Sequence, residues 1–351
     1  MRNRLSTSRS SNSEKPVHLV QIANHNMRRV AVVREPQLVL LRDIDSVFTL
    51  AKKALTEEST LSDVIEEISS DEVLNYDAVY GDQSEWKLLA PIDCPGNPQR
   101  VQVSGTGLTH LGSARERQAM HAATAQEESK MTDSMRMFEW GRQRGRPMEG
   151  SVGIAPEWFY KGDGSIVQAP FRPLPIPGYA EDGGEEAEVA AIYLIADDGT
   201  PWRIGMAAGN EFSDHVFERR NYLNLAGSKL RMCSLGPELV ISPKFDDVPG
   251  EVRILREGKT FWEKQIRTGE SNMCHSLANI EHHHFKFAAH RQPGMLHVHF
   301  MGADSLSFGE GIHLQAGDVT EIHFEGLGRP LRNTIIRDQS LTRPLSVRSL
   351  Q

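Results

Sequence analysis

The sequence predicts an α+β protein in which a small amino-terminal domain precedes a larger second domain. With 351 residues, the chain is long enough to bury more than one hydrophobic core. Residues 17–98 mix short apolar runs of strand length with two segments of helical periodicity, and a loop-rich connector with three prolines ends this part near residue 98. Farther along, residues 189–195 form an uninterrupted apolar run rich in β-branched residues, which is typical of a buried strand.

The amino-terminal domain is expected to contain three strands followed by two helices. The strands are predicted at 18–23, 29–33 and 37–41, and the helices at 44–55 and 61–68. Thr60 is a suitable N-cap for the second helix, because its hydroxyl can accept a hydrogen bond from a free amide of the first turn. Residues 1–16 are rich in Ser and Arg and lack the apolar segment of a secretory signal, so a disordered tail is expected; an organelle transit peptide is the alternative.

The larger domain, residues 99–351, shows strand and helix patterns in turn. Strands are predicted at 189–195, 202–208 and 314–324, a hairpin at 252–255 and 259–267, and helices at 115–130, 216–225 and 271–287, the last capped by Ser271. Residues 115–148 are highly charged and are expected to form a flap or helical insertion with a solvated face.

Composition and charge exclude several classes of partner. The formal net charge is −8, from 39 basic and 47 acidic residues spread along the chain, and no basic stretch suggests a nucleic-acid surface. No apolar run reaches the roughly 18 residues that span a bilayer, so no membrane partner is expected. The three cysteines lack Cys-x-x-Cys spacing, which argues against a disulfide framework or a zinc ribbon and favours a reducing cytoplasm.

Glu186 and Glu188 stand two residues apart at the entrance of the strand predicted at 189–195. On a strand this spacing places both carboxylates on one face. Like charges held side by side raise each other's pKa, and a bound Mg²⁺, Mn²⁺ or Ca²⁺ relieves the repulsion because these cations prefer oxygen ligands. Gly209-Asn210 is expected to turn the chain so that Glu211 returns to the same place. The three carboxylates therefore predict a divalent-cation site.

The ordered set of motifs over residues 100–335 resembles the fumarylacetoacetate hydrolase family. The family pattern runs Glu-x-Glu before a hydrophobic strand, then Gly-x-x-x-x-Asn-Asp-x-Ser, Gly-Lys-Ser and Leu-Gly-Pro. The matching residues are Glu186, Glu188, Asn210, Glu211, Ser213, Lys229, Leu235, Gly236 and Pro237. The resemblance implies a catalytic domain with the family's β-roll, a strongly curved mixed sheet, normally assembled as a homodimer. Glu211 stands where the family has Asp, and a flexible site for a hard cation can absorb the added methylene.

The resemblance also implies which side chains meet the substrate, a small-molecule 2-keto acid. Lys161 lies in a segment that matches Pro-x-x-Phe-x-Lys and would be a cationic neighbour of the substrate or a proton carrier. The family activates water with a His and a Glu, and here Ser113 stands at the His position and Glu116 at the Glu position. His215 replaces a substrate-facing Arg, and Ala303 lies where the family has Gly-Thr-Pro. The predicted catalytic residues are Glu116, Lys161 and Lys229, and the predicted substrate-binding residues are Ser113, His215, Ser228 and Ala303.

The combined pattern predicts a metal-dependent lyase that dehydrates a 2-keto-3-deoxy sugar acid through a metal-bound enolate, as some family members do. A serine without an adjacent base cannot activate water, so Ser113 favours elimination over hydrolysis. The specific prediction is conversion of 2-keto-3-deoxy-L-arabinonate to 2,5-dioxopentanoate. One alternative is hydrolysis of a carbon–carbon bond in a 2,4-diketo acid of the fumarylpyruvate or acylpyruvate type, with His110 or His215 as the base. Another is a catalytically silent protein that binds the metal and a sugar-derived acid.

Two histidine motifs stand outside this scheme. His282-His283-His284 falls in the helix predicted at 271–287, where consecutive side chains point about 100° apart and cannot share one ion, so a structural role is expected. His297-Val298-His299 falls on a strand with both rings on one face, which raises the alternative of a cupin-like iron or zinc site. Cupins also carry a Glu some four residues later, whereas the next Glu here is Glu310. This alternative is therefore disfavoured.

Overall fold

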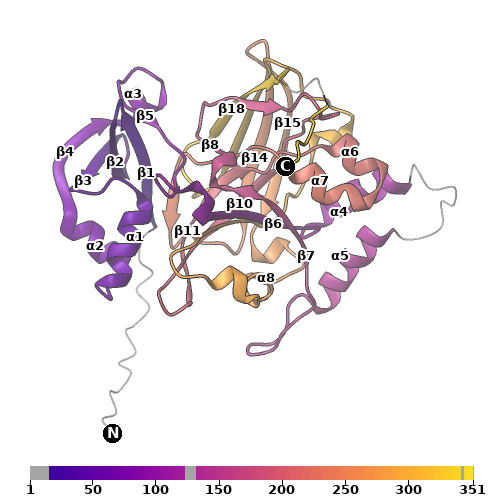
Figure 1. Cartoon of the computed structure of the whole chain (residues 1–351), viewed down its shortest axis with the longest axis horizontal. Coiled ribbons are helices and arrows are strands. Elements are labelled where there is room, and N and C mark those ends of the chain that lie inside the picture. The colour runs from indigo at the N-terminus through magenta and orange to yellow at the C-terminus, as the bar shows by residue number, and fades with distance from the viewer. Residues whose placement is uncertain (1–15, 123–131, 341–343, 351) are drawn as a thin grey trace, which may run out of the picture.

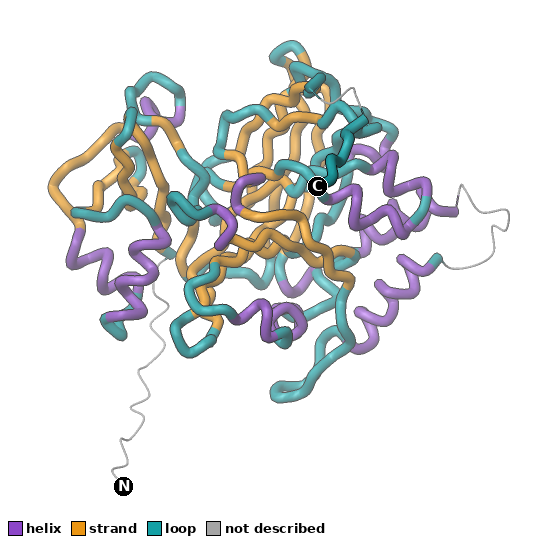
Figure 2. Tube along the Cα trace, in the orientation of Figure 1, coloured by secondary structure: helices purple, strands orange, loops and turns teal. Residues whose placement is uncertain are grey.

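The computed structural model describes residues 16–122, 132–340 and 344–350. Most of the predicted disordered tail and the end of the helix predicted at 115–130 lie outside these residues. Strands form the centre of the molecule and helices lie mainly at its periphery (Figure 2). In the part of the chain that the structure describes, no helix combines the length and the apolar character needed to cross a bilayer.

A thirteen-stranded sheet runs through most of the molecule. Its main path is β4 (Ser69–Asn75), β3 (Gln37–Leu41), β2 (Met27–Arg34), β1 (Val17–Asn24), β13 (Leu239–Ile241), β11 (Pro201–Asn210), β10 (Ala187–Ile195), β16 (Leu296–Phe300), β6 (Val101–Gly107) and β7 (Glu157–Asp163). The short strands β5 (Lys87–Leu88), β8 (Val167–Gln168) and β12 (Cys233–Leu235) pair beside this path. The sheet is mixed, because β16 runs parallel to β6 whereas most other pairs are antiparallel.

A second sheet of five strands packs against the first. Its order is β15 (Lys259–Thr268), β14 (Val248–Arg256), β17 (Val319–Phe324), β18 (Leu331–Arg337) and β9 (Leu174–Ile176). The hairpin predicted around Glu257-Gly258 is confirmed as β14 and β15. The predicted α+β class with mixed sheets is likewise confirmed, and the finer description of the fold as a β-roll stays a prediction.

β10 lies at the centre of the core and is buried along its whole length. Val189, Ala191 and Tyr193 face the apolar cluster shared with the second sheet. The alternate residues face a different cluster, which includes side chains from the amino-terminal helices. Both faces of the strand are therefore covered, which explains why its sequence is a continuous apolar run and does not alternate with polar residues.

The amino-terminal segment is hydrogen-bonded into the larger sheet. Its helices α1 (Val47–Thr56) and α2 (Leu61–Ile68) follow the predicted strands, and Thr60 caps α2 by accepting a hydrogen bond from the amide of Asp63. However, β1 pairs with β13, with Val17 opposite Ile241, so the strands at the left of Figure 1 continue the sheet of the larger part. The division of the chain near residue 98 stays a prediction.

The remaining helices are distributed around the sheets, with α3 beside the amino-terminal strands. They are α3 (Tyr76–Tyr80), α4 (Leu111–Ala122), α5 (Asp133–Arg144), α6 (His215–Arg220), α7 (Leu225–Lys229) and α8 (Leu277–Phe285). In Figure 1, α4, α6 and α7 gather at the right, near β6 and β7. Two helix predictions are corrected. The segment 216–225 is split between α6 and α7. α8 begins at Leu277 with Ser276 as its N-cap, because the predicted cap Ser271 lies in a separate 3-10 turn.

Candidate active site

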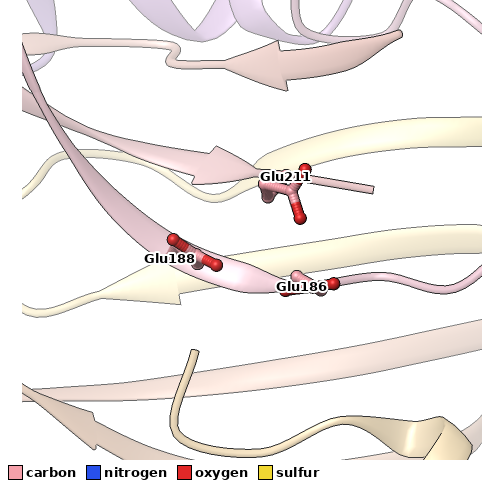
Figure 3. A group of neighbouring side chains, drawn as sticks. All are labelled: Glu186, Glu188 and Glu211. Atoms are coloured by element: carbon pink, nitrogen blue, oxygen red, sulfur yellow. The ribbon is translucent and has the colours of Figure 1, made fainter. Parts of the chain in front are cut away.

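The antiparallel pairing of β10 and β11 brings three carboxylates together. Glu188 lies opposite Gly209 in the hairpin, and the amide of Glu211 donates a 3.0 Å hydrogen bond to the carbonyl of Glu186. All three side chains are buried, and one oxygen from each lies within 4.8 Å of the others. Figure 3 shows Glu186 and Glu188 on one strand and Glu211 on its neighbour. We call Glu186, Glu188 and Glu211 the glutamate trio.

The predicted turn at Gly209-Asn210 is wrong, although the convergence that it was meant to explain is present. Both residues belong to β11, and the chain reverses earlier, between Ile195 and Pro201. The side-chain oxygen of Asn210 accepts a 3.1 Å hydrogen bond from the amide of Glu186. The hairpin ladder therefore sets the position of Glu211 without a second turn.

Two buried lysines neutralise much of the charge of the glutamate trio. The ammonium group of Lys229 lies 2.5 Å from Oε1 of Glu186 and 2.6 Å from Oε2 of Glu211. Lys161 comes from β7, and its Nζ lies 2.5 Å from Oε1 of Glu211. It donates hydrogen bonds of 2.9 Å to the carbonyl oxygens of Phe212 and Lys229. The structure thus brings together the predicted metal ligands and two of the predicted catalytic residues.

Burial and these charges separate the pKa values within the site. Burial, followed by the charges of Glu186 and Glu211, raises the pKa of Glu188 well above its ordinary value. Burial also acts to raise the pKa of Glu186, but Lys229 and His215 outweigh it and hold that pKa well below its ordinary value. Of these two carboxyl groups, Glu188 therefore takes up a proton more readily when no cation is bound.

The two lysines also differ. Burial lowers the pKa of Lys161, and the neighbouring Glu211 offsets this effect only in part. Burial acts in the same direction on Lys229, but Glu186 and Glu211 together raise its pKa above the ordinary value. Lys229 therefore remains a cation, whereas Lys161 loses its proton more easily.

The donor set fits a divalent cation. Oε1 of Glu211 forms an ion pair with Nζ of Lys161 at 2.5 Å, and a carboxylate oxygen has a second lone pair to offer a cation. Three carboxylate oxygens within 4.8 Å of one another are ligands of the kind that Mg²⁺, Mn²⁺ and Ca²⁺ prefer. A cation would also stabilise the ionised form of Glu188, which the protein alone disfavours. The glutamate trio could therefore hold a divalent ion.

His215, a predicted substrate-binding residue, lies against a predicted metal ligand. Its Nε2 is 3.0 Å from Oε1 of Glu186, and its Nδ1 has no hydrogen-bond partner among the described residues. Its ring packs close to the backbone of Gly184, where an added Cβ would lie 2.2 Å from Nδ1. In this geometry His215 orients Glu186.

A loop after β16 holds the start of β10 from the other side. The amide of Gly302 donates a 2.7 Å hydrogen bond to Oε2 of Glu188, and Ser307 donates from its amide and its hydroxyl to the two oxygens of Glu185. Ala303, predicted to bind substrate, lies in a small apolar cluster with Phe308. The sequence analysis missed Glu185, since a carboxylate next to a Glu-x-Glu motif has no distinguishing spacing of its own.

The side chains of Ser228, Ser113 and His110 have hydrogen-bond partners other than the glutamate trio. Ser228 donates to the carbonyl of Leu225 at 2.7 Å, and Ser113 donates to the carbonyl of His110 at 3.3 Å. Both ring nitrogens of His110 have hydroxyl partners, and burial lowers its pKa to about 4. Glu116 lies in α4, and its side chain is outside the described part of the structure.

A buried ionic network next to the site was also missed. Arg117 of α4 donates to Glu157 of β7 at 2.7 Å and lies 3.0 Å from Glu218 of α6. The prediction of a solvated face for residues 115–148 is therefore wrong at Arg117, which is buried. The sequence did indicate that Glu157 lies near the site. Glu157 and Lys161 are four positions apart on one strand, and an even difference in position places them on the same face.

The histidine motifs form a separate cluster behind β16. His297 and His299 have the ring of His284 beside them, and Nε2 of His284 lies 3.0 Å from Nδ1 of His297. Burial lowers the pKa of both strand histidines to about 3. Among the described residues only the glutamate trio has three suitably spaced ligand atoms, so the cupin-like alternative has no support.

Solved structures with the same fold include enzymes that act on keto acids. The 2-keto-3-deoxy-D-arabinonate dehydratase in its apo form aligns with a TM-score of 0.67 and 16% identity, covering 92% of this chain and 100% of that chain. The same dehydratase complexed with magnesium and 2,5-dioxopentanoate aligns at 0.65 and 17%, with the same coverage. The 5-carboxymethyl-2-hydroxymuconate delta-isomerase from Mycobacterium smegmatis aligns at 0.56 and 15%, again covering 92% and 100%.

No protein-family model matches the chain, and no curated protein matches it in sequence. At identities below 20% the structural comparison establishes the fold. The predicted resemblance to the fumarylacetoacetate hydrolase family is confirmed at the level of the fold. The matching structures are the sugar-acid dehydratase and isomerases that have this family's fold.

Proposed function

We propose that the protein is a metal-dependent hydro-lyase that removes water from a 2-keto-3-deoxy sugar acid. The observation that carries this proposal is the buried glutamate trio with Lys161 and Lys229 beside it, in a fold shared with a dehydratase that binds magnesium and 2,5-dioxopentanoate. Ser113 supports elimination over hydrolysis, since it donates to a backbone carbonyl and has no base paired with it among its described contacts.

The charges of the site suit an anionic keto acid once a cation is bound. When Lys161 is neutral and can accept a proton, three carboxylates against the ammonium group of Lys229 leave two negative charges, which a divalent ion cancels. A cation held by the trio would supply the positive charge that makes a proton on C3 of a keto acid acidic. The aromatic ring of Phe159, 4.9 Å from Nζ of Lys229, excludes water from one side of the site.

The side chains divide the proton transfers between them. Lys229 forms ion pairs with Glu186 and Glu211, and its raised pKa keeps it protonated, so it is poorly suited to accept a proton. Lys161, whose pKa is lowered by burial, is better suited to take the C3 proton, and Glu116 is the alternative base. Ser113, Ser228 and Ala303 remain the proposed substrate contacts.

The reaction balances as the loss of one water. The C3 proton and the C4 hydroxyl leave, and a double bond forms between C3 and C4. One proton then leaves C5 while another adds to C3, and the resulting enol takes a proton at C4 and loses its hydroxyl proton to give the aldehyde of 2,5-dioxopentanoate. C4 is the only stereocentre of a five-carbon substrate, so the L and D acids give the same product. The L acid is our specific proposal, and the D acid is named for the similar dehydratase.

The test uses the full-length protein, treated with EDTA and then reloaded with Mg²⁺. It is incubated with each enantiomer of 2-keto-3-deoxyarabinonate and, separately, with fumarylpyruvate, and the products are identified by mass spectrometry. Formation of 2,5-dioxopentanoate, with solvent deuterium at C3 and C4 when the reaction runs in D₂O, supports the lyase. Release of pyruvate alone refutes it in favour of the hydrolase. Tight binding of the sugar acid without turnover refutes it in favour of a silent binding protein. A homodimer and a cytoplasmic location remain proposals.

A further inference from the structure

Helix α4 carries Ser113 and Glu116, yet it has very little apolar surface with which to pack. Among the side chains of α4 that the structure describes, only Ala114 and Arg117 are buried. Ala114 lies in a small apolar cluster with Leu108 and Phe138, and a methyl group contributes little hydrophobic free energy. The position of the helix therefore depends on its polar contacts, of which those of Arg117 are buried.

Arg117 connects α4 to two other elements at once. Its Nη1 donates a 2.7 Å hydrogen bond to Oε1 of Glu157, and its Nε lies 3.0 Å from Oε1 of Glu218. Burial alone lowers the pKa of this guanidinium, but the two carboxylates raise it above its ordinary value, so the group stays charged. A planar guanidinium has several N–H groups and can contact a carboxylate on a strand and another on a helix at the same time. The compact ammonium group of a lysine is less suited to bridge both.

The carboxylate of Glu157 is held in place by its surroundings. Its Oε2 accepts a 2.7 Å hydrogen bond from the hydroxyl of Tyr222, and Gly107 leaves the space for this side chain, since an added Cβ would lie 1.9 Å from its Oε1. Glu218 is buried and lies 3.4 Å from the hydroxyl of Ser228. Arg117 therefore binds to two buried carboxylates, of which Glu157 has a second close partner.

The two elements that hold Arg117 also supply the site. Glu157 lies on β7, which carries Lys161, and Glu218 lies on α6, which begins at His215. We infer that Arg117 is a positioning residue that docks α4, and with it Glu116, against the metal site. This inference rests on the proposed function for its kinetic consequence, whereas the docking itself can be measured without any turnover.

The experiment compares four variants of the Mg²⁺-loaded full-length protein. Arg117→Met removes the charge and keeps most of the stem, Arg117→Lys keeps the charge, and Glu218→Gln leaves Arg117 paired with Glu157 in case the first variant does not fold. Arg256→Met is the matched control, because Arg256 makes two 2.8 Å hydrogen bonds to Asp318 in the second sheet, outside the site. Hydrogen exchange of residues 111–118, the affinity for Mn²⁺, and kcat and KM for the sugar acid are measured for each.

In Arg117→Met we expect α4 to exchange at least tenfold faster than in the wild type, kcat to fall at least 30-fold, and the Mn²⁺ affinity to change less than threefold. Arg117→Lys and Glu218→Gln should give intermediate values, and Arg256→Met should lower the melting temperature without changing α4 exchange or kcat. The inference is overturned if α4 exchange is unchanged, if kcat stays within threefold, or if Mn²⁺ binding is lost together with kcat. An inactive wild type with the expected exchange pattern would overturn the proposed function and support the docking role.

Discussion

Replacing Glu188 by Gln should stabilise the metal-free protein and at the same time weaken its binding of a divalent cation. The reason is the raised pKa of Glu188, which burial and the charges of Glu186 and Glu211 cause. A carboxyl group whose pKa is raised on folding costs no stability below its unfolded pKa, and the cost grows as the pH rises from that value toward the folded pKa. A glutamine has no proton to take up and therefore avoids this cost.

The size of the effect has an upper bound. The loss of folding stability cannot exceed the free energy needed to protonate the carboxylate. For a carboxyl group with an ordinary pKa of about 4.3, this free energy is about 3.7 kcal/mol at pH 7 and about 1 kcal/mol at pH 5. For a chain of this length, roughly 2 °C of melting temperature corresponds to 1 kcal/mol. In EDTA, Glu188→Gln should therefore melt several degrees above the wild type at pH 7 and only 1 or 2 °C above it at pH 5.

The assay is thermal unfolding in EDTA and in excess Mg²⁺ at both pH values. Calorimetric titration with Mn²⁺ should also show about one proton released per ion from the wild type, because Glu188 must ionise to bind it. Mg²⁺ should raise the melting temperature of the wild type but not that of the variant. Glu263→Gln, which removes an exposed carboxylate far along the chain, is the control. A variant less stable than the wild type in EDTA at pH 7, or a difference that does not shrink at pH 5, would refute the reasoning.

Three further predictions concern other buried groups of the molecule and the loop beside the site. Burial lowers the pKa of His110 to about 4 and that of His297 to about 3. The free energy of unfolding should therefore keep its full value above pH 6.5, and each histidine should lower it by on the order of 2 kcal/mol at pH 5, as measured by urea unfolding. Glu238→Ala should lower the free energy of unfolding by about 3 kcal/mol or more, because that buried carboxylate accepts three hydrogen bonds. Tyr76→Phe removes one of these bonds and should lower it by about 1 kcal/mol. Equal losses for the two variants in chemical denaturation would contradict this prediction. Gly302→Ala should weaken Mn²⁺ binding at least tenfold, since a methyl group there would lie 2.0 Å from a buried threonine hydroxyl and shift the amide that holds the trio; unchanged calorimetric affinity would contradict it.

Local patterns were sufficient to predict much of the fold and the shared position of Glu186 and Glu188. The spacing of Glu186 and Glu188 defines one face of a strand whatever the rest of the chain does, and the cap of Thr60 depends on residues within one turn. Where two serines could each begin a helix, as at Ser271 and Ser276, the choice depended on packing that the local sequence does not record.

The features that were missed depend on partners far apart in the sequence. From the local sequence Arg117 is predicted to belong to a charged surface, because its partners on β7 and α6 are distant in the sequence. The pairing of β1 with β13 is equally hidden, because neither strand carries a signal for its partner. The role of His215 depends on a contact with Glu186 that a motif comparison, which placed it at a substrate-facing position, could not anticipate.

The pairing of β1 with β13 has a consequence for the order of events during synthesis. The amino-terminal strands can form their own hairpins early, and β5 pairs with Ile22 and Ala23 of β1. The rest of that edge, Val17–Leu19, has no partner until the ribosome has made the chain as far as Ile241. Until then an unpaired strand edge is exposed to other nascent chains, and such edges promote aggregation. Slowing translation within residues 99–241 should therefore lower the soluble yield more than slowing it after residue 250.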